Sequence, residues 1–413
     1  MLNPLASLER RIISAILTRI RAHSGTVSES RGDTHAHPGE VIAQAKLRAA
    51  QFSDYAAVTE LKRRWGLIPD SLENWEKLWR NNPALARTQF ERPIGWVLEA
   101  DGRVVGYHGN IPLIYRYGDR TLAAVTSHGF VVEPSYRALG LTLSAAFFRQ
   151  TSVDLWVITT AIESSGKIAR AFKTESLSQT DYDTVLFWVL NPSEFARAVM
   201  TKLRLKSPLS WVGRQLVSFA VRFDTTFRGR RPKTSSRDLA VRDLAVSEIG
   251  EEFQSLWDAK LNEGARLFAD RSPAVLKWHF EIPGDTGNTR VLCCHANGEL
   301  AGYAVVRNGA DREDGLVRSV IADMLVKQDD PYLAEALFVA AYANARRAGS
   351  HVLEVKGLPQ SIRKVCSQWN PYERQFPSSP YFYKAADPVL QESLKGETAW
   401  YATPFDGDAT LMP

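Results

Sequence analysis

The sequence predicts an α+β protein of two lobes, each built on a mixed, mostly antiparallel sheet flanked by helices. Two Asx-Gly pairs, Asp101-Gly102 and Asn297-Gly298, each separate two apolar runs, which is the signal of a β-hairpin. Strand-like and helix-like segments alternate on both sides of a basic connector. Their order is the same in both halves (strand, helix, helix, hairpin, strand, helix, strand, helix, strand), which predicts an internal duplication of the arrangement.

Length and composition are those of an ordinary globular protein. The chain has 413 residues, 45% of them apolar and 23% charged, which favours two or three domains. Its three cysteines, Cys293, Cys294 and Cys366, lack the spacing of a zinc site, so we expect no metal and a reducing compartment. A run of about 18 apolar residues does not occur, so we predict no transmembrane helix and a cytoplasmic protein.

The segments group into five parts along the chain. The first part combines a basic helical stripe, with apolar residues from Leu5 to Ile20, and a linker rich in Gly, Ser, Thr and His. This stripe is either a packing helix or a helix on a membrane surface. The expected parts are an N-terminal basic amphipathic segment and linker at 1–44, a first lobe at 45–195, a basic connector at 196–237, a second lobe at 238–390 and a tail at 391–413.

The first lobe begins with a short strand and a helix that Ser53 or Asp54 can cap. We expect Ala57, Leu61 and Trp65 to lie on one face of this helix. A Trp-rich helix ended by a proline, the Asp101-Gly102 hairpin and a third long strand follow. The remaining predicted elements are a helix after residue 137, a strand at 154–162, a short helix from residue 165 and a strand at 181–190.

The connector holds the basic charge of the chain. Between Arg197 and Arg237 there are eleven Lys or Arg and one acidic residue, Asp224, which is +10 in 41 residues; the total is +5, so the rest of the chain carries −5. Its middle has helical spacing, with these apolar residues on one side: Leu209, Val212, Leu216, Phe219 and Phe223. Such charge suits an anionic partner, and a peripheral membrane contact is one candidate.

The second lobe repeats the pattern and ends in a short tail. Its predicted elements are a strand at 239–244, helices at 249–261 and 272–281, the Asn297-Gly298 hairpin, a strand at 317–326, a helix at 332–349, a strand at 351–355, a short helix and a final strand at 381–385. In the tail, Asp406 and Asp408 form an Asp-x-Asp pair without further spaced ligands, so we expect a solvent-facing turn rather than a metal site.

One motif in the first lobe indicates chemistry. A strand ends at Val132-Glu133-Pro134, and Tyr136-Arg137-Ala138-Leu139-Gly140-Leu141-Thr142 follows before a helix. The segment resembles the acyl-CoA loop of the GCN5-related N-acetyltransferases, Gln/Arg-x-x-Gly-x-Gly/Ala. Arg137 and Gly140 match that pattern, and Thr142 stands where the family has Gly or Ala.

The resemblance implies a site for the pyrophosphate of acetyl-CoA. Backbone amides at a helix start bind anions, Gly140 would let them approach, and Arg137 would add charge-assisted hydrogen bonds. It also implies that the preceding strand pairs with the pantetheine and that its parallel neighbour splays away from it. The implied cofactor-binding residues are Phe130, Val131, Val132, Arg137, Ala138, Leu139, Gly140, Leu141, Thr142, Ser165 and Phe172.

An N-acetyltransferase also needs a base for its ammonium substrate. His128, beside the motif strand, and Glu163, at the end of the neighbouring strand, are the candidates; a water relayed by backbone carbonyls is the alternative. Phe172 stands where the family often has the tyrosine that protonates the thiolate. Because a phenyl ring has no proton to donate, the sequence leaves the general acid unidentified.

The second lobe lacks the motif. Asp329 and Asp330 stand where its helix begins and would repel a pyrophosphate, so we expect no CoA site there. This arrangement is similar to that of tandem double-GNAT proteins with a degenerate C-terminal lobe, among which are the Fem-type aminoacyl transferases.

The resemblance therefore implies transfer of an acetyl group from acetyl-CoA to an amine, with an amino sugar or cell-envelope precursor as a possible acceptor. Two alternatives stay open: a Fem-like transferase using aminoacyl-tRNA, and a non-catalytic two-lobe binding module. Nucleic-acid binding as the main role is unfavoured, because the basic residues cluster in one connector without interleaved aromatic residues facing one way.

Overall fold

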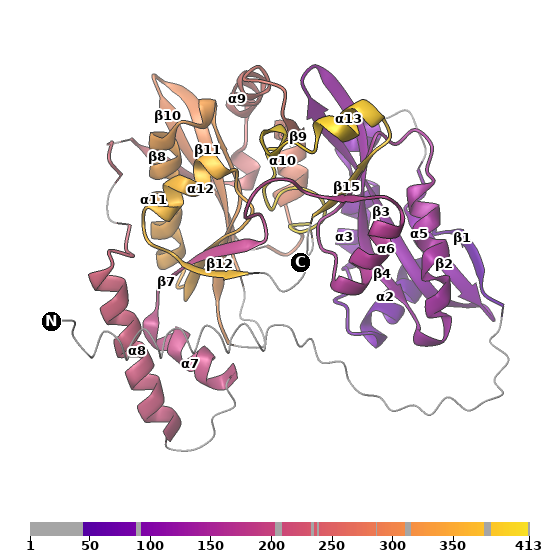
Figure 1. Ribbon diagram of the computed structural model, residues 1–413, viewed down its shortest axis with the longest axis horizontal. Helices are drawn as coiled ribbons and strands as arrows, with labels where there is room; N and C mark the ends of the chain where they lie inside the picture. Colours follow the sequence, from indigo (N-terminus) through magenta and orange to yellow (C-terminus); the bar gives the residue numbers. More distant parts are fainter. Residues whose placement is uncertain are drawn as a thin grey trace. The chain divides into compact units, whose positions relative to one another are not determined.

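The structure is a computed structural model that describes residues 44–87, 92–202, 209–232, 235–237, 239–285, 287–309, 315–375 and 381–411. The predicted N-terminal amphipathic segment and almost all of its linker lie outside these residues. The described chain forms two compact units, each with its own sheet (Figure 1). The first lobe comprises 44–179, 264–284 and 381–411, and the second lobe comprises 180–263 and 285–375.

The first lobe has an eight-stranded sheet. Its neighbours pair antiparallel, except that β4 and β5 run parallel. The strand order is β1 (Lys46–Ala49), β2 (Gly95–Ala100), β3 (Arg103–Tyr117), β4 (Arg120–Val132), β5 (Leu155–Ile158), β15 (Phe382–Ala385) and β6 (Glu175–Ser176), with β9 (Leu267–Ala269) added to β3.

The second lobe has a seven-stranded sheet with the same strand order and one parallel pair, β12 with β13. The order is β8 (Val241–Ala245), β10 (Thr289–Ala296), β11 (Glu299–Asn308), β12 (Arg318–Val326), β13 (Val352–Val355), β7 (Thr184–Val189) and β14 (Tyr372–Gln375). The prediction of two lobes with mixed, mostly antiparallel sheets is confirmed.

Both predicted hairpins are present, β2–β3 and β10–β11. At their turns Asp101 and Gly102 have φ of 50° and 69°, and Asn297 and Gly298 have 54° and 83°. Positive φ at both central residues defines the turn whose twist matches a hairpin, and Asx-Gly adopts it at low cost.

Helices flank each sheet. The first lobe has α2 (Tyr55–Arg64), α3 (Leu72–Trp79), α4 (Pro83–Arg87), α5 (Gly140–Phe148), α6 (Glu163–Ala171), α10 (Pro273–Phe280) and α13 (Pro388–Ser393). The second has α7 (Pro192–Lys202), α8 (Leu209–Phe227), α9 (Glu251–Leu261), α11 (Pro331–Arg347) and α12 (Gln360–Ser367). On α2, Leu61 and Lys62 are buried, whereas Ala57 and Trp65 are exposed.

Two strands lie in the opposite sheets from those their sequence neighbours suggested. β7 pairs with β13 and β14 in the second lobe, and β15 pairs with β5 and β6 in the first (Figure 1). The helix α10 also belongs to the first lobe, where Trp278 Nε1 donates to the Lys77 carbonyl. The structure thus differs from the expected ranges 45–195 and 238–390, because an apolar strand pattern identifies a strand but not its partner.

The tail was also placed wrongly by sequence reasoning. Asp406 and Asp408, expected in a solvent-facing turn, are each 1% exposed. Asp406 lies 3.7 Å from the guanidinium of Arg271, which is itself fully buried. Burial of two carboxylates requires charged or hydrogen-bonding partners, and the first lobe supplies them.

Candidate active site

The parallel strands β4 and β5 part at one end. Their pairing joins Ala124, Val125 and Thr126 to Leu155, Trp156 and Val157. β5 ends at Ile158, whereas β4 continues to Val132. The last six residues of β4 therefore have no β5 partner among the described residues, which agrees with the splay that the resemblance implies.

A bulge deforms β4 in this unpaired stretch. Tyr107 on β3 faces Val131 and Gly109 faces His128, so two residues of β4, Gly129 and Phe130, oppose one residue of β3. Gly129 has φ 61°, and a Cβ there would lie 2.5 Å from Cε of Lys62. The positive φ favours glycine here, and any larger residue would also have to displace the end of the Lys62 side chain.

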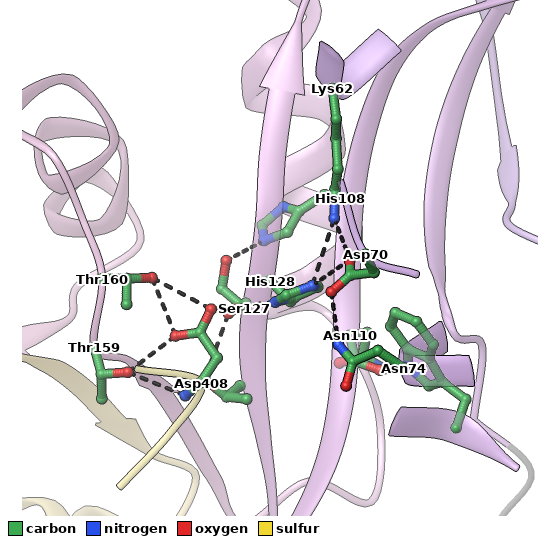
Figure 2. Close-up of polar contacts among 12 residues, drawn as sticks. Lys62, Asp70, Asn74, His108, Asn110, Ser127, His128, Thr159, Thr160 and Asp408 are labelled. Carbon is green, nitrogen blue, oxygen red and sulfur yellow. Dashed lines mark hydrogen bonds and ion pairs between the residues drawn. The ribbon is translucent and has the colours of Figure 1, made fainter. Parts of the chain in front are cut away.

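His128 lies just before the bulge, inside a buried polar cluster (Figure 2). Its Nε2 is 3.0 Å from Oδ2 of Asp70 and 3.5 Å from Nζ of Lys62, and its Nδ1 is 3.3 Å from Oδ2 of Asp408. Lys62 donates to Asp70 at 2.7 Å, and Asn74 donates to the other oxygen of Asp70 at 2.8 Å. His128 is 1% exposed, so solvent does not screen these contacts.

Asp408 connects the tail to the end of β5. Its carboxylate accepts hydrogen bonds from Oγ1 of Thr159 and Oγ1 of Thr160, each at 3.0 Å, while its N–H donates to Oγ1 of Thr159 (Figure 2). Gly407 has φ 67°, and a Cβ there would lie 2.4 Å from Oγ1 of Thr159. The tail thus closes over the place where β4 and β5 diverge.

The cluster sets the protonation of its members. Burial and the Lys62 charge act to lower the pKa of His128, but Asp70 and Asp408 outweigh them and raise it above its ordinary 6.5. Burial would raise the pKa of Asp70, but His128 and Lys62 hold it well below its ordinary 3.8. The arrangement is an imidazole between two carboxylates, able to accept a proton and hold it.

A second histidine lies nearby but has a different character. His108 on β3 is 2.8 Å from Oγ of Ser127 and stacks on Phe147. Burial lowers its pKa to about 3, so it is neutral at physiological pH. It packs the sheet beside the bulge and carries no charge for catalysis.

The predicted phosphate loop is wound more tightly than expected. Residues Pro134–Leu139 form a 3-10 helix that runs directly into α5. The N–H of Tyr136 donates to Glu133 and that of Gly140 donates to Arg137, so these two amides already have partners. The 9% exposed side chain of Tyr136 anchors the loop in the core.

The rest of the loop faces outward. Arg137, Ala138, Leu141 and Thr142 are exposed, and Leu139 is half-buried. The Arg137 side chain has no hydrogen bond or ion pair with any described residue. An unengaged guanidinium at this position can meet an anionic ligand.

Some of the other predicted cofactor-binding residues lie on β4, and others pack in the core or at a helix start. Val131 is buried, and Phe130 and Val132 are half-buried on the free part of β4. Phe172 stacks on Phe148 at 4.9 Å within an apolar cluster. Ser165 lies in the first turn of α6, where its Oγ accepts from the N–H of Ile162, the N-cap residue.

Glu163, the second predicted base, lies apart from the histidine cluster. Its side chain is 79% exposed and pairs with Lys167 at 2.9 Å on the first turn of α6. Lys167 lowers the pKa of Glu163. Within the described chain, no hydrogen bond or ion pair joins Glu163 to the His128 cluster.

Sequence reasoning selected His128 as a candidate base but did not anticipate the groups that surround it. Lys62 on α2 and Asp70 after α2 look like solvated charges in the sequence, and Asp408 was assigned to a turn. One signal was available for Lys62: it lies next to Leu61 and four residues after Val58, on the stripe that α2 buries. No comparable signal marks Asp70.

The helix start of the second lobe is occupied by its own side chains. Oδ1 of Asp330 accepts from the N–H groups of Tyr332 and Leu333, and Asp329 pairs with Lys260 at 2.6 Å. These amides are the groups that would have to bind a phosphate. The absence of a CoA site from this lobe stays a prediction.

Metal and thiol chemistry find no support among the described residues. No group of three or more His, Cys, Asp or Glu there is placed to hold a metal ion. All three cysteines are buried and free, and burial raises the pKa of Cys293 and Cys366 to about 12. Within the described residues, no helix is both long and apolar enough to cross a membrane.

Comparison with solved structures identifies the fold. The chain is similar to a GCN5-related N-acetyltransferase from Anabaena variabilis (TM-score 0.53, 10% identity, 83% of this chain and 73% of that one). It is similar to another from Kribbella flavida (0.52, 11%, 84% and 73%) and to a probable N-acyltransferase of unknown function from Enterococcus faecalis (0.52, 10%, 86% and 74%). No protein-family model and no curated protein sequence matches the chain.

Proposed function

The chain has the fold of the GCN5-related N-acetyltransferases, and from this premise we propose that it transfers an acetyl group from acetyl-CoA to an amine. The observation that carries the proposal is the parting of β4 and β5 beside His128. An unpaired strand edge there offers backbone groups to an extended ligand. A titratable side chain with a raised pKa adjoins the same edge.

The chemistry proposed for His128 is proton transfer. Acetyl-CoA supplies the acetyl group as a thioester. The neutral imidazole takes a proton from the ammonium, the freed amine attacks the thioester carbonyl, and backbone N–H groups near Phe130–Val132 stabilise the oxyanion. When the C–S bond breaks, the protonated His128 returns that proton to the thiolate, and the second proton of the attacking nitrogen leaves to water, which gives the neutral amide and the free thiol of CoA. This assigns the general acid that Phe172 cannot be.

The buried site requires the tail to move during turnover. His128 is 1% exposed and Asp408 closes the cluster, so an amine reaches the imidazole only when the tail segment around Gly407 opens. Closure afterwards would exclude water from the thioester. Asp408 is thus proposed as a positioning residue that also tunes the imidazole.

Acetyl-CoA is expected to raise the melting temperature of the protein, and Arg137→Glu is expected to abolish that rise. Arg137 is exposed and unengaged within the described chain, so a carboxylate in its place would repel the pyrophosphate. Differential scanning fluorimetry measures both effects. Arg149→Glu, an exposed arginine at the other end of α5, is the matched control and should keep the rise.

The same measurement separates the alternatives. If acetyl-CoA raises the melting temperature of wild type and of Arg137→Glu equally, the loop that contains Arg137 does not bind the pyrophosphate. If acetyl-CoA and longer acyl-CoAs shift nothing, the two-lobe binding module is favoured, and the paired amides of the 3-10 turn agree with that outcome. Stabilisation by aminoacyl-tRNA instead would indicate the Fem-like reaction.

The pH dependence of kcat/KM should show the raised pKa of His128 in the buried cluster. Because the base must be neutral and its pKa is raised, kcat/KM is expected to rise with pH through an apparent pKa above 6.5. Asp408→Asn removes one of the two carboxylates and should move that pKa toward 6.5. An unchanged profile in this variant would contradict the tuning role of Asp408.

The acceptor and location belong to the same proposal. We place the acceptor among amino sugars or amine-bearing envelope precursors, and the protein in the cytoplasm with peripheral contact to a membrane. The basic connector, at +10 in 41 residues, supports an anionic partner. Release of free thiol from acetyl-CoA across a panel of amines tests the acceptor class directly.

A further inference from the structure

Helix α8 of the second lobe presents an apolar stripe to solvent. Leu216, Phe219, Phe223 and Phe227 are 65%, 67%, 39% and 75% exposed. Their spacing of three, four and four residues places them on one side of the helix. Phe223 and Phe227 stack on each other at 4.0 Å. Four large apolar side chains exposed on one helix form a patch that a soluble surface rarely carries.

The opposite side of α8 is already packed. Val221 is 5% exposed and lies, with Val217, against an apolar cluster that includes Phe187 of β7 and Val352 of β13. Ser218 and Thr225 on this side are also buried. Since the lobe uses this side to hold the helix, the exposed stripe is not part of the lobe's own core.

The charge around the stripe is positive. The one acidic residue of the connector, Asp224, is engaged by Arg228 and Arg230 at 2.8 Å each and by the hydroxyl of Tyr372 at 2.6 Å. Arg222 is exposed on the helix itself. The surroundings of the stripe therefore combine an excess of guanidinium groups with apolar side chains.

We propose that the α8 stripe docks on an anionic membrane surface. Phenylalanine and leucine on one face of a helix flanked by arginine are what an interfacial helix requires: the rings enter the acyl boundary and the guanidinium groups meet lipid phosphates. The helix lies on the surface and does not span it. This docking does not depend on the proposed acetyl transfer.

The positive charge around the α8 stripe argues against two other partners for it. A second copy would bring another connector of +10 against the first. The N-terminal amphipathic segment is also basic, with Arg10, Arg11, Arg19 and Arg21 among its apolar residues. Each would add like charges to the surface, whereas an anionic bilayer neutralises them.

Vesicle flotation tests the docking. The full chain is expected to float with phosphatidylcholine vesicles that contain ~30% phosphatidylglycerol and not with pure phosphatidylcholine, and high salt should weaken binding. In the triple variant F219S/F223S/F227S, the ratio of vesicle-bound to free protein is expected to fall about tenfold or more, because little apolar area then enters the bilayer. The variant I162S/V389S, which removes two exposed apolar side chains of the first lobe, should bind as wild type does.

Two further readouts complete the test. Circular dichroism and the melting temperature check that the triple variant folds; if it does not, Phe227→Ser alone, at the most exposed position, should reduce flotation in part. Equal flotation of wild type and stripe variants would overturn the proposal. So would failure of wild type to float, or a dimer in light scattering that the triple variant abolishes. A retained acetyl-CoA melting shift in the triple variant shows that the site of the first lobe is separate.

Discussion

Replacing His128 with glutamine is expected to lower kcat by about 10²- to 10⁴-fold while acetyl-CoA still raises the melting temperature. The amide nitrogen of glutamine can donate to one of the two carboxylates, Asp70 or Asp408, but glutamine cannot take a proton from the amine. Free-thiol release from acetyl-CoA with amino sugars such as glucosamine as acceptors measures the rate. His295→Gln, at a half-exposed histidine on β10 of the second lobe, is the control and should leave kcat unchanged.

The pH profile distinguishes a base from a structural residue. The residual activity of His128→Gln should lose the rise through the pKa above 6.5 that wild type is expected to show. A kcat of His128→Gln within threefold of wild type would contradict the assignment of His128 as the general base. Glu163→Gln would then be the next variant to measure. If both variants retain activity, a water relayed by backbone carbonyls supplies the base.

Replacing Asp70 with alanine is expected to lower the free energy of unfolding of the first lobe by about 3–5 kcal/mol. The side chains of Lys62 and Asp70 are each 3% exposed, and His128 is their neighbour. Without the carboxylate, a buried ammonium and a buried imidazole lose the charge that compensates them. Glu76→Ala breaks an exposed helical pair with Arg80, and as a control it should cost at most about 0.5 kcal/mol.

The pKa shifts of Asp70 and His128 determine how their contribution to the free energy of unfolding depends on pH. The pKa of Asp70 is lowered in the folded state, so its contribution is present above its ordinary 3.8 and is lost in acid. The pKa of His128 is raised, so its contribution is complete below 6.5 and fades as pH rises through the raised value. Urea unfolding of wild type and Asp70→Ala should therefore differ most between these limits, and a difference that does not vary with pH would contradict the ionic origin.

Some features of this protein were determined locally and could be predicted from the sequence. Asp101-Gly102 and Asn297-Gly298 predicted their hairpins because few residue pairs adopt two positive φ angles at low cost. The repeated order of strands and helices predicted two sheets of equal layout, because apolar periodicity fixes which side of each element is buried. The Arg137-x-x-Gly140 motif, and the Asp329-Asp330 pair in its place in the second lobe, were also read from neighbouring residues, and their effect on CoA binding stays a prediction.

Other features depended on contacts between distant residues, and only the tertiary structure decided them. β7 and β15 are apolar strands that either sheet could accept, so their sequences could not say that each joins the other lobe's sheet. The partners of His128 lie 58 and 280 residues away in Asp70 and Asp408. A carboxylate in a sequence is by default a solvated surface group; it becomes a buried partner only when the fold brings a compensating charge to it.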